Sequence, residues 1–120
     1  MTTADKLSRT LAVAAAGFCS ISALLFSSQA MAWSDVDRIR EAQALGNLLA
    51  SEDFCNITYN QTAIETYIDS AVPDNDMQFP SMLTLMTDSA KFNFEDMSPS
   101  QKTAHCAQIK RVAKAHDFLQ

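Results

Sequence analysis

The residues that could bind a metal ion or carry out catalysis are few and widely spaced in this sequence. His105 and His116 are the only histidines. Eleven residues along one helix would separate them by about 16 Å, too far for one metal ion. No serine lies in a nucleophile-elbow context, and neither a zinc-protease motif nor a phosphate-binding loop is present. We therefore expect a protein that is not an enzyme and that holds no cofactor.

Methionine thioethers are the remaining candidate ligands. Met82 and Met86 lie one helical turn apart, and thioethers bind Cu(I) in oxidising compartments. Phe79 and Leu83 are interleaved with them, and such a stripe is typical of a hydrophobic core or of an adaptable groove for a partner. The sequence leaves the core, the groove and the copper site open as interpretations.

Charge is distributed unevenly along the chain. Residues 33–98 carry three bases and twelve acids, whereas residues 99–120 carry four bases and one acid. Lys110, Arg111 and Lys114 fall near a predicted helix C-terminus, where cations are favoured and can complement acids on neighbouring helices. They could instead form a strip for an anionic partner or membrane surface. The net charge of −5 argues against nucleic acid as a partner.

The first thirty-two residues are typical of a secretory signal peptide. Lys6 and Arg9 precede an uncharged run over 10–26, and the small-x-small pattern of a cleavage site ends at Ala32. The run of 17 residues is rich in alanine and serine and reaches only the bottom of the range that spans a membrane. We predict cleavage between Ala32 and Trp33, Sec-type export to the periplasm or beyond, and no stable membrane insertion of the product.

The processed chain, residues 33–120, would be one domain with a single pair of cysteines. It would hold 88 residues, with 7 bases and 13 acids for a net charge of −6. Cys19 would leave with the signal peptide, and Cys55 and Cys106 would form a disulfide in an oxidising compartment. Their separation of 51 residues corresponds to about 4 kcal/mol of stabilisation in the chain-entropy model. That is comparable with the whole stability of a small domain.

Four segments after Trp33 have the apolar spacing of amphipathic helices. The expected helices cover 34–50, 59–71, 76 to about 90, and 99–118, with 92–94 either a frayed end or a connector. Their start signals are Ser34, a Thr58/Gln61 capping box, Asp76 and Ser98-Pro99. The chain has two glycines and no alternating strand pattern. We predict an all-α fold, a compact bundle of about four short helices stapled by one disulfide.

Two resemblances bear on function. The stretches Cys55–Ile68 and Lys102–Ile109 resemble a set of small exported proteins of alphaproteobacteria that have no established function. In outline the chain is also similar to the enteric periplasmic acid-stress chaperones, which share a signal peptide, a short helical mature chain and one long-range disulfide. This second likeness is architectural, and it implies a protein that binds other proteins during envelope stress.

The sequence thus favours a non-enzymatic periplasmic protein-binding protein, and a chaperone active in envelope or acid stress is the form of it that we consider. Protonation of most carboxylates near pH 2–3 would make the processed chain strongly positive and loosen its helix packing. The alternative is a small adaptor or inhibitor that docks on one periplasmic partner. A Cu(I) carrier is a third hypothesis. The candidate partner-binding residues are Lys110, Arg111, Lys114, Met82 and Met86, and the oligomeric state is left open.

Overall fold

The computed structural model describes residues 32–119 of the chain. The predicted signal peptide lies outside the described residues apart from Ala32, and it stays a prediction. The description that follows concerns residues 32–119 alone.

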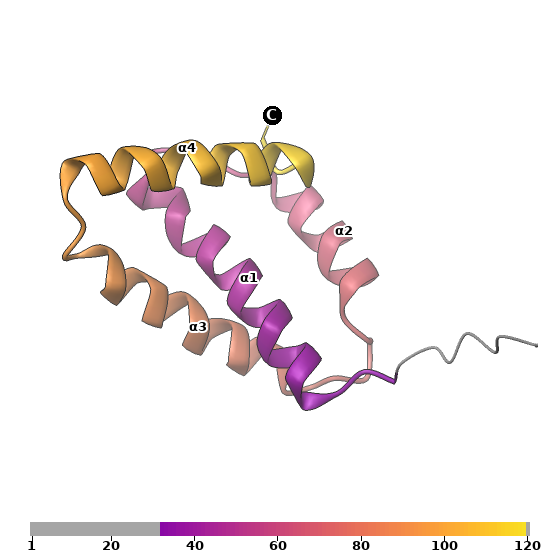
Figure 1. Ribbon diagram of the computed structural model, residues 1–120. Coiled ribbons are helices and arrows are strands. Elements are labelled where there is room, and N and C mark those ends of the chain that lie inside the picture. The colour runs from indigo at the N-terminus through magenta and orange to yellow at the C-terminus, as the bar shows by residue number, and fades with distance from the viewer. Residues whose placement is uncertain (1–31, 120) are drawn as a thin grey trace, which may run out of the picture. The chain divides into compact units, whose positions relative to one another are not determined.

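The described chain is all-α, as predicted, and contains four helices (Figure 1). Within residues 32–119 the only β-type pairing is an isolated antiparallel bridge between Tyr59 and Leu119. The helices are α1 (Asp35–Phe54), α2 (Gln61–Ala71), α3 (Phe79–Phe94) and α4 (Pro99–Ala115). The expectation of an all-α bundle is therefore confirmed.

Two helices begin at the cap residues that the sequence predicts, Ser34 and Ser98, and each of these residues forms a capping box. The Ser34 side chain accepts a hydrogen bond from the Asp37 backbone N–H, and the Asp37 carboxylate accepts from the Ser34 N–H. The Ser98 hydroxyl and the Gln101 side chain make the same reciprocal pair at the start of α4. Each box satisfies two backbone groups that a helix N-terminus otherwise leaves without a partner.

The other two helices begin later than the sequence predicts. Asn60, not Thr58, caps α2 by accepting from the Ala63 backbone N–H. Asp76 does not sit directly before α3. Its carboxylate accepts from the backbone N–H groups of Gln78 and Phe79 instead, so that α3 starts at Phe79.

Two helices end in Schellman motifs that use a residue other than glycine. After α1, Asn56 has a φ of 53°, and Ile57 N–H donates to the Glu52 carbonyl. After α4, Asp117 has a φ of 59°, and the N–H of Phe118 donates back to Ala113. The left-handed conformation tolerates Asn and Asp better than other side chains, although glycine adopts it at lower cost.

These helix ends correct the predicted boundaries. Helix α1 extends to Phe54 rather than to residue 50, and residues 92–94 form the last turn of α3. Helix α4 ends at Ala115 instead of Phe118, because the chain reverses at Asp117. The reversal returns the last residues to the body of the fold, where the Phe118 carbonyl accepts from the Asn60 N–H.

Helices α1 and α3 form the most extensive helix–helix contact of the described chain. Small residues Ala42, Gly46 and Ala50 follow each other at intervals of four along α1, and all three are buried. A Cβ atom built on Gly46 would lie 3.0 Å from Met86 Cβ and 3.0 Å from the Thr87 backbone nitrogen. The absence of a side chain at Gly46 therefore sets how closely the two helices approach.

The main core cluster lies where all four helices meet. Its largest fully buried side chains include Tyr59, which precedes α2, and Phe118, which follows α4. A second, smaller cluster joins the C-terminal halves of α1 and α3. The first cluster consists of Ala42, Leu45, Leu48, Tyr59, Phe79, Ile109, Ala113 and Phe118, and the second of Ala50, Ala90 and Phe94.

Candidate functional site

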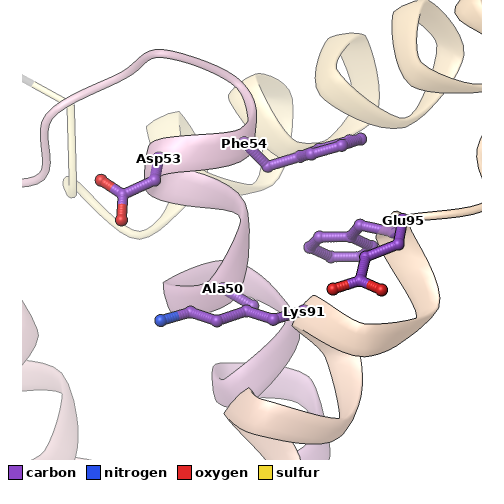
Figure 2. A pocket seen from close by; sticks show the side chains of 6 residues that line it. Ala50, Asp53, Phe54, Lys91 and Glu95 are labelled. Carbon is purple, nitrogen blue, oxygen red and sulfur yellow. The ribbon is translucent and has the colours of Figure 1, made fainter.

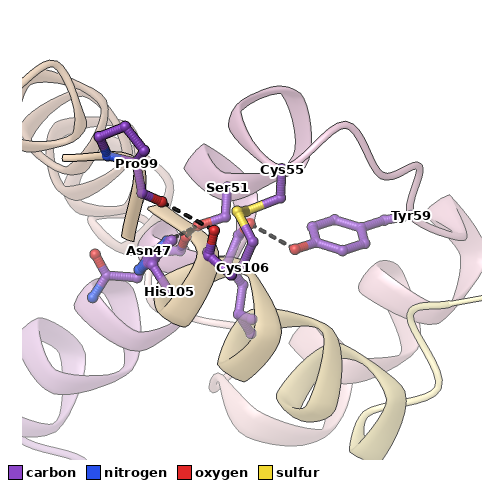
Figure 3. Close-up of a disulfide and its surroundings, with 9 residues drawn as sticks. Asn47, Ser51, Cys55, Tyr59, Pro99, His105 and Cys106 are labelled. Atoms are coloured by element: carbon purple, nitrogen blue, oxygen red, sulfur yellow. Dashed lines mark hydrogen bonds between the residues drawn. A yellow bond between two sulfur atoms is a disulfide. The ribbon is translucent and has the colours of Figure 1, made fainter. Parts of the chain in front are cut away.

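The predicted disulfide is present and joins the end of α1 to α4. Cys55 caps the C-terminus of α1, and its sulfur is bonded to that of Cys106 in the first half of α4 (Figure 3). The Cα atoms are 5.4 Å apart, and Cys55 is buried. The disulfide is a covalent link between α1 and α4.

His105 lies next to the disulfide and makes a hydrogen bond with the fully buried Ser51 (Figure 3). The Ser51 hydroxyl lies 2.6 Å from the Asn47 carbonyl and 2.8 Å from His105 Nε2. Since the hydroxyl donates its only proton to the carbonyl, it accepts from Nε2–H of the imidazole. The imidazole is thus a donor to Ser51 and does not activate it as a base would, so the pair is a packing contact.

Two phenyl rings surround the imidazole of His105. Phe94 and Phe54 lie with ring centroids 4.7 Å and 5.9 Å from that of His105. Burial among them lowers the pKa of His105, because the charged form loses hydration there. On the same helix as His105, Lys102 Nζ lies 4.4 Å from the ring centroid of Phe54.

Helix α2 is fastened to α1 by two carboxylates. The Tyr67 hydroxyl of α2 donates to the Glu41 carboxylate of α1. Just before α2, the Tyr59 backbone N–H donates to Glu52 Oε1 over 2.8 Å. No residue of α2 itself is fully buried. Partly buried residues of α2 pack against the main core cluster, so this packing and the carboxylate contacts together attach the helix.

Burial is the main cause of the shifted pKa values of both tyrosines. It raises the pKa of Tyr67 to about 12, and the hydrogen bond to Glu41 acts in the same direction. It raises the pKa of Tyr59 to about 12 as well, with the Glu52 charge adding to the effect. Both phenols are therefore protonated donors at any pH below about 10. The Tyr67 phenol donates to the Glu41 carboxylate, whereas the Tyr59 phenol donates to the backbone carbonyl of Leu48.

A third carboxylate holds the loop after α2. Asp76 Oδ2 accepts from the Trp33 indole N–H over 2.6 Å and from Arg38 Nε over 2.7 Å. Its side chain is only 3% exposed. Burial would raise the pKa of Asp76, but the hydrogen bonds from Arg38, Trp33 and the Gln78 N–H outweigh it and lower the pKa. The Arg38 pKa is raised by the same contact, aided by Asp35.

The second histidine lies between α2 and the end of α4. The ring centroid of His116 is 4.8 Å from that of Tyr67 and 5.7 Å from that of Phe118. An open cleft of about 500 Å³ runs beside it and is lined by α2 residues together with Ala115 and Asp117. His105 and His116 thus occupy separate aromatic surroundings and do not share a site.

The predicted basic residues Lys110, Arg111 and Lys114 are all exposed on α4. The ion pairs found among residues 32–119 involve only Arg38 or Arg40, so none pairs a base of α4 with an acid on a neighbouring helix. Arg111 makes one long hydrogen bond, 3.5 Å to Gln108. These bases therefore form an exposed basic strip along α4.

The predicted methionine pair packs against the core. Met82 and Met86 are partly buried and contact the main core cluster, and Met86 lies at the close approach of α3 to Gly46. Residues 32–119 contain no group of three or more His, Cys, Asp or Glu side chains placed to hold a metal ion. Their position favours the core interpretation.

The predicted cleavage site adjoins the start of α1. Ala32 is exposed, whereas Trp33 is partly buried through its bond to Asp76. None of the helices described here has the length and apolar character needed to cross a membrane.

The sequence did not predict the hydrogen bonds that hold the segment before α1, the loop after α2 and α2 itself in place. The bond from Trp33 to Asp76 spans 43 residues and that from Tyr67 to Glu41 spans 26. Neither leaves a local pattern. The one available signal was that Trp33 is the only tryptophan of the chain, since a tryptophan tends to find a partner for its N–H when it is partly buried.

Comparisons of the chain with protein-family models, with curated proteins and with solved structures each gave no match.

Proposed function

We propose that this chain is an exported, non-enzymatic protein-binding protein, a chaperone whose binding surface opens in acid. The supporting observation is that carboxylates fasten the least buried helix, α2, and the loop that follows it. Export through the predicted signal peptide is part of the proposal, because acid reaches the periplasm and the cell exterior first.

Acid weakens the contacts at α2 through the carboxylates that accept them. A hydrogen bond to a carboxylate loses its charge assistance when acid protonates the group, and the lowered pKa of Asp76 means that its bonds to Trp33 and Arg38 persist to lower pH than those of an ordinary Asp. His116 and Asp117 line the cleft beside α2 from the end of α4. The disulfide and the apolar contact of α1 with α3 do not depend on pH.

Loss of α2 would uncover apolar surface for a client. Ile64, Tyr67 and Ile68 of α2 pack against the main core cluster, and release would expose both sides of that contact. The bases of the processed chain then exceed its ionised acids, and the resulting self-repulsion keeps α2 displaced. Exposed apolar patches of this kind bind unfolded proteins without a fixed sequence motif.

An aggregation assay tests the proposal. Oxidised protein, obtained by expressing the whole 120-residue chain, is mixed with acid-denatured alcohol dehydrogenase near pH 2–3, and light scattering is followed. We expect suppression of aggregation in acid and none near neutral pH. Tyr67→Phe removes the hydroxyl that binds Glu41 and is expected to extend suppression to higher pH. Thr66→Ala is the matched control, since its hydroxyl bonds only within α2, to Thr62.

Two outcomes would overturn the acid mechanism. Absence of any suppression by the oxidised protein in acid would remove the chaperone function. Suppression that is identical for Tyr67→Phe and the parent at every pH would remove α2 release as its cause. Amide hydrogen exchange of α2 at both pH values separates the two, because it reports on the opening of the helix without a client.

One observation favours a second candidate function. The basic strip of Lys110, Arg111 and Lys114 is exposed and makes no ion pair with another described residue. This suits an adaptor that docks on one acidic partner at neutral pH. Affinity capture from periplasmic extract distinguishes the functions: one stoichiometric partner near neutral pH supports the adaptor, and many clients only in acid support the chaperone.

A further inference from the structure

A small pocket lies between the C-terminal ends of α1 and α3, away from α2 and from the basic strip. It has a volume of about 240 Å³ and is lined by Ala50, Asp53, Phe54, Lys91, Phe94 and Glu95. Figure 2 shows the Asp53 and Glu95 side chains on opposite sides of the pocket in this view, with Phe54 and Lys91 bounding the other two. Phe54 and Phe94 are an aromatic pair within this lining, with ring centroids 4.7 Å apart.

The size of the pocket favours one side chain as its occupant. Pockets for metabolites and drug-sized ligands usually measure about 300–1,000 Å³, which is more than this pocket offers. A single anchor residue of a partner protein, buried in a pocket of this kind, often contributes most of the affinity of an interface. The occupant therefore belongs to a protein segment.

The charge around the pocket favours a cation. Two helices end here, at Phe54 and Phe94, and a helix C-terminus carries a partial negative charge. Asp53 and Glu95 add two carboxylates, and neither takes part in the ion pairs found among residues 32–119. Lys91 is the one base that lines the pocket. The Lys102 ammonium lies 4.4 Å from the centroid of the Phe54 ring, so this aromatic surface accepts cations, and a bound arginine would compete with Lys102 for it.

We propose that this pocket binds an arginine side chain from an exposed basic segment of a partner protein. The methylene stem would lie on Phe54 and Phe94, and the guanidinium would donate to the carboxylates of Asp53 and Glu95. Arginine suits this surface better than lysine, because its planar fork bonds carboxylates in pairs and stacks on aromatic rings. The site acts at neutral pH with α2 in place, and it does not depend on the acid-chaperone function.

Peptide titrations near neutral pH test the site. The probe is a capped Ser-Gly-Ala-Arg-Ala-Gly-Ser peptide, compared with the same peptide carrying lysine, leucine or glutamate at the centre. Isotope-labelled protein from the whole chain is titrated, and the backbone amide signals of residues 50–54 and 91–95 are followed. We expect saturable shifts with the arginine peptide, binding by lysine weaker by about three-fold or more, and no saturable shifts with leucine or glutamate.

Variants with opposite expected effects make the test specific. Asp53→Asn and Glu95→Gln change exposed side chains and should each weaken binding of the arginine peptide by about five-fold. Lys91→Gln removes the competing cation and should tighten binding. Asp69→Asn, which removes an exposed acid from α2, is the matched control and should leave affinity unchanged.

The proposal is overturned if the leucine peptide binds as well as the arginine peptide, since the pocket would then be a purely apolar site. Weaker binding after Lys91→Gln would overturn it too, because it would indicate an anionic occupant. Shifts confined to residues outside 50–54 and 91–95 would place the arginine elsewhere. A normal helical spectrum for each variant shows that a lost signal reflects the pocket and not unfolding.

Discussion

Replacing Gly46 by alanine tests whether the close approach of α1 to α3 governs stability. In an exposed helix interior the change would stabilise the protein by about 0.5–1 kcal/mol, because glycine is the more flexible residue. Here the new Cβ would lie 3.0 Å from the Thr87 backbone nitrogen and 3.1 Å from the Met86 carbonyl carbon. Backbone atoms cannot rotate away, so the helices must separate.

The packing cost should exceed the gain in helix propensity. Overpacking a buried contact typically costs about 1–3 kcal/mol, so the net change expected for Gly46→Ala is a destabilisation of about 1–2 kcal/mol. For a domain of this size each kcal/mol corresponds to a fall in Tm of roughly 4–8 °C. Urea unfolding followed by the helical circular dichroism signal measures the effect.

A neighbouring substitution provides the control. Asn47→Ala, at an exposed position, should stabilise the protein by about 0.5 kcal/mol through helix propensity alone. The reasoning is refuted if Gly46→Ala stabilises the protein to the same extent, because α3 would then yield to a methyl group at no cost.

Three further predictions concern single contacts. Replacing both Cys55 and Cys106 by alanine should lower the free energy of unfolding by about 4 kcal/mol. Urea titrations of the variant and of the oxidised parent measure the difference. A change below about 1 kcal/mol would contradict stabilisation through the lower entropy of the unfolded, cross-linked chain. Asp117→Gly should raise the free energy of unfolding by about 1 kcal/mol, because glycine adopts the left-handed φ without strain and the change removes an acid from a helix C-terminus. A loss of stability in the same titration would show that the Asp117 carboxylate makes a stabilising contact. For Asp76, the lowered folded-state pKa means that the stabilisation is present above the unfolded pKa of about 4 and is lost as pH falls through the folded value. Asp76→Asn should therefore have a lower free energy of unfolding than the parent near neutral pH, and it should lose less of that free energy as pH falls below about 4. Trp33 fluorescence, the only indole signal, follows the transition. Parallel curves for the two proteins would exclude Asp76 as the source of the pH dependence.

The lowered pKa of His105 gives a separate pH effect at milder acidity. The fold favours the neutral imidazole. The contribution of His105 to the free energy of unfolding is therefore fully present above its unfolded-state pKa of about 6.5, and it decreases as pH falls toward the lower folded-state pKa. His105→Gln should flatten the dependence of stability on pH just below 6.5. Denaturant titrations at several pH values measure this, and an unchanged slope would contradict the burial of the imidazole as its cause.

Local sequence signals predicted the helices, whereas the positions of their ends and the tertiary contacts between them depend on residues that are distant in sequence. The boxes at Ser34 and Ser98 are complete within four residues, so the start of α1 and of α4 could be inferred. The ends could not, because Asn56 and Asp117 stop their helices in a left-handed conformation that glycine more often marks. In the sequence, Gly46 indicates only a position of low helix propensity. Its role in the close approach of α1 to α3 could not be predicted, because the sequence does not show which helix packs against it.

The candidate site was predicted in part. Cysteine count and expected export were enough to pair Cys55 with Cys106, because no other partner would remain in the processed chain. The burial of Ser51 beneath His105 was not predictable, since serine at a helix interior is usually solvent-facing and its partner lies 54 residues away. The pocket at Phe54 and Phe94 also had no sequence signal, because the two helix ends meet only in the fold.

The bond between Cys55 and Cys106 encloses α2, α3 and the loop between them in one covalent ring. A protease that cut the chain once in the exposed stretch at Asp74 and Asn75 would open the ring without dividing the molecule. The two pieces would migrate as one species on a gel until a reductant separated them. A nicked protein would thus persist at full mass while the disulfide stays oxidised, with its α1–α4 junction intact.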